Sequence, residues 1–216
     1  ASKKYRESEL LRESTPFSEN GNEVCFITIG DASTSEGVFW ETVNAAGVQK
    51  VPLAISVWAD GYGISVPFEF QTTKGSISEV LQGFQLDEQG RGIELYRIKG
   101  WDYPALCEAY EKGIEKMRQP HIPALFHIDE LTPPQGHSTS GSHERYKSAE
   151  RLDWERDRDC IVVMGQWIVD SELASPEEVE RIREEAKVYV RKAKQIAWKK
   201  YLDPIKKETV RLQTWV

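Results

Sequence analysis

Two aspartates, each following an apolar run, are the residues of this chain best suited to chemistry. Asp31 lies in the glycine- and serine-containing run 30–37, and Asp60 opens the run 60–63. Carboxylate oxygens are hard donors that suit Mg²⁺ or Ca²⁺. Mg²⁺ commonly takes one or two carboxylates and completes its octahedron with phosphate oxygens and water. The two aspartates therefore predict a site for a phosphate ligand bridged by a metal ion.

The runs that precede the two aspartates are predicted to be strands of one βαβ unit. Residues 24–29 and 53–58 are apolar, and the segment between them has helical periodicity. A right-handed crossover would make the strands parallel and bring both loops to the carboxyl edge of the sheet, where α/β proteins bind ligands. A helix that begins near Ser35 or Glu36 would point its free N–H groups at the same place, which favours an anion.

The α/β pattern continues along the chain. Apolar residues alternate with other residues over 92–98 and form a continuous run over 124–128, and both patterns are typical of strands. Residues 103–118 and 76–82 have helical patterns. The expected fold class is therefore α/β, with a mostly parallel sheet flanked by helices. The serine-, threonine-, glycine- and proline-rich run 132–142 is predicted to be a long loop, of the kind that is either functional or disordered.

A helix over residues 176–201, with Ser175 as its N-cap, is predicted for the last part of the chain. Its apolar stripe is interpreted as packing on its own domain, and an interface role is the alternative. Among the histidines, His127 lies in a predicted strand and is interpreted as a packed residue. His121 follows a predicted helix end and is interpreted as a surface residue.

Residues 30–60 resemble the cofactor motif of the thiamine-diphosphate-dependent 2-oxo acid dehydrogenases, specifically the α-type half of their decarboxylating component. The family motif opens with Gly-Asp-Gly and closes with a paired Asn, where this chain has Gly30-Asp31-Ala32 and Ala59-Asp60. Asp60 keeps an oxygen ligand but adds charge, whereas Ala59 removes a polar group. The resemblance implies a thiamine-diphosphate-binding fold with a helical C-terminal extension. It implies that Mg²⁺ is held by Asp31, Asp60 and the backbone carbonyl of Tyr62. The cofactor contacts that it implies are Gly30, Asp31, Ala32, Ser33, Asp60, Tyr62, Ile64 and His137.

A second segment, residues 134–146, resembles the loop that these α-type halves close over the cofactor, and its Gly-His-Ser-Thr-Ser core is similar to the branched-chain type. The resemblance places His137 beside the diphosphate and the thiazolium ring as a catalytic residue, which donates a hydrogen bond or assists proton transfer. Ser138 matches a serine that is a regulatory phosphorylation site in some relatives. A phosphate there would repel a bound diphosphate.

The function implied by the resemblance is oxidative decarboxylation of a branched-chain 2-oxo acid, of the 2-oxoisovalerate type. The thiamine carbanion attacks the 2-oxo carbon, carbon dioxide leaves, and the acyl group passes reductively to a lipoyl group on the acyltransferase component. A β-type half would supply the glutamate that activates the aminopyrimidine, either as a separate chain or as a missing part of the same polypeptide. A homo- or hetero-oligomer is therefore expected, and the isolated chain is expected to be inactive. The alternatives are a pyruvate-specific or transketolase-like thiamine enzyme and a non-catalytic fragment that binds a Mg²⁺-phosphate ligand.

Composition narrows the function classes. A net charge of −7 over 216 residues argues against non-specific nucleic-acid binding, which needs a basic surface. The three cysteines are dispersed, which favours a reducing compartment, and neither a membrane span nor a signal peptide is recognised in the sequence, so the expected location is cytoplasmic. The expected domains are a polar segment over residues 1–22, interpreted as the remnant of a longer chain, a cofactor-binding α/β domain over 23–148, and a helical extension of that domain over 149–216.

Overall fold

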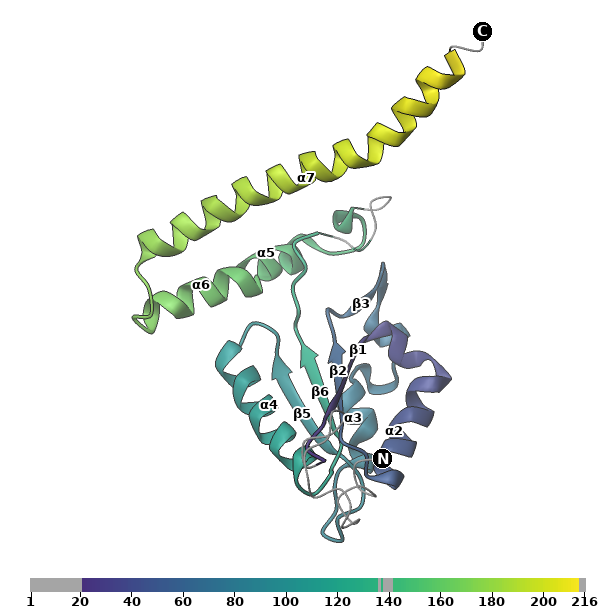
Figure 1. Cartoon of the computed structure of the whole chain (residues 1–216). Helices are drawn as coiled ribbons and strands as arrows, with labels where there is room; N and C mark the ends of the chain where they lie inside the picture. Colours follow the sequence, from purple (N-terminus) through teal and green to yellow (C-terminus); the bar gives the residue numbers. More distant parts are fainter. Residues whose placement is uncertain (1–20, 136, 138–141, 214–216) are drawn as a thin grey trace. The chain divides into compact units, whose positions relative to one another are not determined.

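Figure 1 shows a computed structural model that describes residues 21–135, 137 and 142–213. The chain divides after Met164 into two compact units, residues 1–164 and residues 165–216. The first unit contains the elements that position the predicted site, and most of the described part of the second unit is one long helix, α7.

Four parallel strands form the central sheet of the first unit, in the order β1-β2-β6-β5. Their bounds are Cys25–Gly30 for β1, Leu53–Trp58 for β2, Glu94–Lys99 for β5 and Ala124–Asp129 for β6. The predicted parallel α/β sheet is therefore confirmed. Gly30 pairs with Trp58, and Trp58 pairs with Ile128, so β1, β2 and β6 end at the same edge of the sheet.

Helices cover both faces of this sheet (Figure 1). Helix α2, Gly37–Gln49, connects β1 to β2, and helix α4, Tyr103–Arg118, connects β5 to β6. Because side chains alternate between the faces of a strand, each strand contributes to two separate cores. On the α2 side, Ile55 and Val57 pack with Val43, whereas on the α4 side Ala54 and Phe126 pack with residues of α4 such as Met117.

Short elements connect the strands at the edge that carries the predicted site. The loop after β2 forms a small antiparallel hairpin, in which β3 pairs with β4. After β6 come η6 and then α5, and part of the predicted long loop over 132–142 lies outside the described residues. The bounds of these and the remaining short elements are η2 Ala32–Ser35, β3 Tyr62–Gly63, β4 Val66–Pro67, η3 Phe68–Phe70, η4 Thr73–Gly75, α3 Ile77–Val80, η5 Leu81–Phe84, η6 His143–Arg145, α5 Ala149–Asp157 and α6 Cys160–Asp170.

Helix α7 spans Pro176–Gln213 in the second unit. Its start was predicted, and Ser175 forms a capping box: the Ser175 Oγ accepts from the N–H of Glu178 at 3.3 Å, and the Glu178 carboxylate accepts from the N–H of Ser175 at 2.9 Å. The predicted end at residue 201 was wrong, because the helix continues past Pro204. No glycine or asparagine follows residue 201 to cap an earlier end.

Two histidine predictions have opposite outcomes. His127 is buried in β6, as predicted, and its Nδ1 lies 2.9 Å from the Ser78 Oγ. The prediction of a surface position for His121 was wrong, because this residue is only 3% exposed and its Nε2 lies 3.3 Å from the carbonyl oxygen of Gly21. Among the helices of the described residues, none is both long enough and apolar enough to cross a membrane.

Candidate functional site

A cavity of about 1030 Å³ opens at the carboxyl edge of the sheet, in the first unit. The loops after β1 and β2 both line it, as the sequence predicted from their positions after neighbouring parallel strands. The third wall comes from the segment after β6 and from the start of α6, at residues 159–161. The lining includes every residue that was predicted to contact the cofactor, namely Gly30, Asp31, Ala32, Ser33, Asp60, Tyr62, Ile64 and His137.

Asp31 joins the two predicted loops. Its side chain is buried, its Oδ1 accepts from the N–H of Ala32 at 2.8 Å, and its Oδ2 accepts from the N–H of Gly61 at 3.0 Å. Burial raises the pKa of the Asp31 carboxyl above its ordinary value, and the nearby charge of Asp60 adds to this, whereas the two backbone hydrogen bonds lower it. One carboxylate therefore fixes the distance between the loops and leaves negative charge at the cavity wall.

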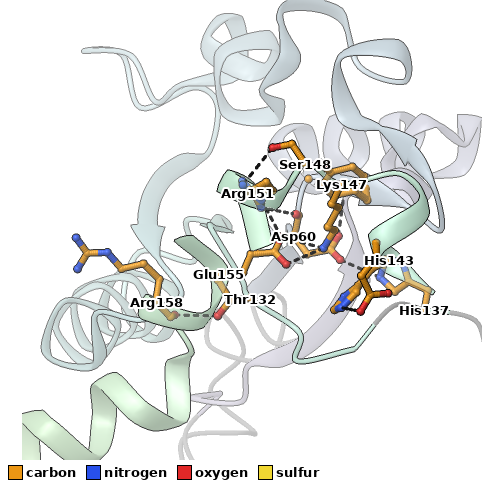
Figure 2. A network of polar contacts seen from close by, with 12 residues as sticks. Asp60, Thr132, His137, His143, Lys147, Ser148, Arg151, Glu155 and Arg158 are labelled. Carbon is orange, nitrogen blue, oxygen red and sulfur yellow. Dashed lines mark hydrogen bonds and ion pairs between the residues drawn. The ribbon is translucent and has the colours of Figure 1, made fainter. Parts of the chain in front are cut away.

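Asp60 is the second carboxylate of the cavity and is also buried. Its Oδ1 accepts from the N–H of Tyr62 at 3.1 Å, and its Oδ2 lies 2.9 Å from the Nε2 of His137. The Nδ1 of the same histidine lies 3.4 Å from the carbonyl oxygen of Ile64. Figure 2 shows the contact between His137 and Asp60. The structure thus brings the predicted catalytic residue against one of the two predicted metal ligands.

The oxygen donors of Asp31 and Asp60 fit a hard divalent cation in kind. Each carboxylate oxygen can accept more than one hydrogen bond or metal contact, so the backbone contacts described above leave coordination capacity. Within residues 21–135, 137 and 142–213, no three histidine, cysteine or acidic side chains form a metal site on their own. A cation held here would therefore complete its coordination with backbone, ligand and water oxygens, which is the usual arrangement for Mg²⁺.

Apolar side chains form the rest of the cavity wall. Trp58, at the end of β2, is partly exposed and lines the cavity. The other apolar residues of the lining are Ile64, Val66, Leu131, Pro133, Pro134 and Ile161. Such a wall suits the apolar part of a ligand.

A group of charged residues beside the cavity was not predicted. Lys147 and Glu155 form an ion pair whose side chains are only 1% and 5% exposed, with the Nζ of Lys147 2.8 and 2.9 Å from the two carboxylate oxygens (Figure 2). The Nε of Arg151 lies 2.7 Å from the same carboxylate, and its guanidinium donates to the backbone carbonyl of Asp60 at 3.3 Å. In the sequence, these residues resemble an ordinary charged helix surface, so no local pattern distinguishes them.

The predicted regulatory residue, Ser138, lies outside the described residues, as do most of the Gly-His-Ser-Thr-Ser motif residues around it. Of that motif, His137 is described, and its place in the cavity is given above.

Comparison with known proteins identifies one family. The model of the family described as "Dehydrogenase E1 component" matches residues 8–206. A pyruvate dehydrogenase E1 component subunit alpha of Rickettsia felis is 22% identical over 172 residues, which cover 80% of this chain and 50% of that protein. The 2-oxoisovalerate dehydrogenase subunit alpha 1, mitochondrial, of Arabidopsis thaliana is 30% identical over 181 residues, which cover 82% of this chain and 36% of that protein. A pyruvate dehydrogenase E1 component subunit alpha of Porphyra purpurea is 30% identical over 165 residues, which cover 76% of this chain and 44% of that protein. The chain therefore spans about half the length, or less, of these relatives.

Proposed function

This chain belongs to the dehydrogenase E1 component family, and we propose that it is the α-type, cofactor-binding part of a thiamine-diphosphate-dependent 2-oxo acid dehydrogenase. One observation carries the proposal beyond family membership. Asp31 and Asp60 come from two different strand-end loops, and Asp31 joins those loops by accepting from Gly61 at the wall of the cavity. This is where a metal-bound diphosphate would need two hard oxygen donors.

The residues of the cavity divide into three roles. Asp31, Asp60 and the backbone carbonyl of Tyr62 would hold Mg²⁺ against the diphosphate. Backbone groups of the loop after β1 would contact the cofactor, where small residues allow a close approach. Ile64 would contact the cofactor from the hairpin side. The residues of the loop after β1 whose backbone would contact the cofactor are Gly30, Ala32 and Ser33.

His137 is the group best placed to act on a reacting molecule in this cavity. Bound thiamine diphosphate supplies the nucleophilic carbon and the electron sink for decarboxylation, and the protein orients it and excludes water. His137 reaches the cavity from the loop after β6, and Asp60 orients its ring through the 2.9 Å contact. It would donate a hydrogen bond to the diphosphate or move a proton at the substrate oxygen.

We propose a branched-chain 2-oxo acid as the substrate. The apolar wall formed by Trp58, Ile64 and Leu131 with other residues suits an aliphatic acyl group, and the motif around His137 is similar to that of the branched-chain type. Full activity would need a β-type half and a lipoyl-bearing acyltransferase. With both partners added, 2-oxoisovalerate should exceed pyruvate in kcat/KM, roughly tenfold or more for the additional methyl groups. A higher kcat/KM for pyruvate than for 2-oxoisovalerate would refute this assignment and would identify pyruvate as the preferred substrate.

The cofactor site is tested by calorimetric titration with thiamine diphosphate, with Mg²⁺ and with excess chelator, in the presence and absence of the β-type half. Binding should require Mg²⁺ and should be lost in Asp31→Asn, which removes the charge but keeps the size of the side chain. Asp153→Asn is the matched control, because Asp153 is exposed and pairs only with Arg156 among the ion pairs described. Equal binding by Asp31→Asn and the control would overturn the assignment of Asp31.

Decarboxylation measured in the same mixtures tests the remaining alternative. A non-catalytic Mg²⁺-phosphate module would bind the cofactor but would release no carbon dioxide from any 2-oxo acid after the β-type half is added. The proposed function instead predicts decarboxylation that depends on both parts and on Mg²⁺.

A further inference from the structure

The ion pair between Lys147 and Glu155 is unusual because both side chains are almost fully buried. Removing two charges from water costs free energy that their attraction only partly returns, so a buried ion pair is weak support for a role in stability alone. Both oxygens of Glu155 are occupied: Oε1 contacts Lys147 and Arg151, and Oε2 contacts Lys147. One carboxylate therefore holds two cations.

Both cations contact the loop that follows β2. The Nζ of Lys147 lies 4.7 Å from the centre of the Tyr62 ring, and the guanidinium carbon of Arg151 lies 5.8 Å from it. Arg151 also donates to the backbone carbonyl of Asp60 at 3.3 Å. Figure 2 shows this chain of contacts from Lys147 through Glu155 and Arg151 to Asp60. Two charged side chains from a distant part of the sequence thus fix both the backbone and the aromatic ring of one loop.

The same loop contains a backbone conformation that it would not keep without support. Ile64 has a φ of 60°, in the left-handed region, which is a genuine outlier for a β-branched residue. Gly61, with a φ of 84°, allows the preceding turn without such strain. Strained conformations of this kind persist only where surrounding contacts over-determine them. Ile64 also lines the cavity, so the strain lies at the candidate site.

We propose that Arg151, held in place by Glu155 and supported by Lys147, is a positioning residue that fixes the loop 60–64 in the conformation that presents Asp60 and Tyr62 to a metal-bound diphosphate. The restraint on the loop follows from the contacts above and needs no ligand. Its consequence for cofactor affinity rests on the proposed function. Glu155 acts through Arg151, because without its charge the two cations repel each other and Arg151 loses the contact that orients it toward the Asp60 carbonyl.

The restraint is tested first on the cofactor-free chain, by hydrogen exchange of peptides that cover residues 59–66. Arg151→Gln removes the contact with Asp60, and we expect exchange in these peptides to become about tenfold faster, which corresponds to one lost charge-assisted hydrogen bond. Arg156→Gln is the matched control, because Arg156 lies on the same helix, pairs with the exposed Asp153, and is itself exposed. Unchanged exchange in Arg151→Gln, with both variants unfolding at similar temperatures, would overturn the proposal.

Cofactor affinity is the second measurement, made on the chain together with the β-type half. The dissociation constant for Mg²⁺ and thiamine diphosphate should rise about ten- to a hundredfold in Arg151→Gln and in Glu155→Gln, as is usual for residues that support metal ligands. Because Glu155 acts through Arg151, the double variant should be no weaker than the weaker single variant. Fully additive losses would contradict this order of action.

The two measurements separate this inference from the proposed function. If exchange in the loop is faster in Arg151→Gln but the wild type does not bind the cofactor, the proposed function is refuted. The restraint on the loop would still stand. Normal cofactor binding by the wild type, together with unaltered affinity and unaltered exchange in Arg151→Gln, would refute the restraint on the loop. The proposed function would still stand.

Discussion

Acid should destabilise this protein through His127, a histidine that the fold keeps uncharged. His127 is 2% exposed in the central strand β6 and shares a contact with Ser78. Burial lowers the pKa of its imidazole from the ordinary 6.5 to about 4; Arg97 and Lys99 also lower the pKa, and Asp129 partly opposes the shift. Between these two values, the unfolded chain binds a proton that the folded chain does not.

The sign and size of the effect follow from this difference. Because the unfolded state binds more protons below pH 6.5, stability falls as the pH falls from about 6.5 toward 4. Linkage gives a loss of about 2 kcal/mol between pH 7 and pH 5, and about 3 kcal/mol by pH 4. A loss of this size is a large fraction of the typical stability of a domain.

The assay is urea unfolding of the 216-residue chain at pH 7, 6 and 5 for the wild type and for His127→Gln. Titrations that the two proteins share cancel in the difference between their free energies of unfolding. That difference should shrink by about 2 kcal/mol in going from pH 7 to pH 5, because only the wild type loses the contribution of a neutral buried histidine. Ser78→Ala keeps the histidine and should retain the pH slope of the wild type. Parallel curves for wild type and His127→Gln would refute the reasoning.

The remaining predictions concern charges at two other places. Glu155→Gln should lower the free energy of unfolding by about 3–5 kcal/mol, because it leaves the buried ammonium of Lys147 without a counter-charge. Lys147→Met should cost less, because Arg151 still pairs with Glu155; equal losses in chemical denaturation would contradict this asymmetry. Asp102→Ala should cost about 0.5–2 kcal/mol, because the Asp102 carboxylate caps helix α4 by accepting from the N–H of Ala105 at 3.1 Å. An unchanged unfolding midpoint would show that the cap contributes nothing.

The strand-end loops could be predicted from the sequence because their signals are local. Apolar runs followed by Asp31 and by Asp60 indicate two strand ends, and the parallel pairing then brings the two loops together. The hydrogen bond from the Gly61 N–H to the Asp31 carboxylate could not be predicted, because it depends on how the two loops are placed in the folded chain. The left-handed conformation of Ile64 had no signal at all, since its residue type argues against it.

Residues that act through long-range contacts could not be predicted from the sequence either. Arg151 and Glu155 are four positions apart on α5, which is the spacing of an ordinary surface ion pair. Only the folded chain shows that Lys147 joins Glu155 in a buried ion pair and contacts Tyr62 in the loop after β2. His121 was misplaced for the same reason, because the sequence does not show which segment covers a residue after a helix end.

The pairing of β2 with β6 has a consequence for the order of folding. Residues Ala54 and Ala124 are partners in this pairing, although a long stretch of chain separates them, whereas β1 with β2 and β5 with β6 are each joined through one helix. Contacts between distant residues form late, because closing the intervening loop costs entropy before the contact is made. We therefore expect the units β1-α2-β2 and β5-α4-β6, the two halves of the sheet, to form first. The pairing of β2 with β6, the seam between the halves, should form afterwards. The two aspartates belong to one half and His137 to the other, so the cavity would come into existence only when the seam closes.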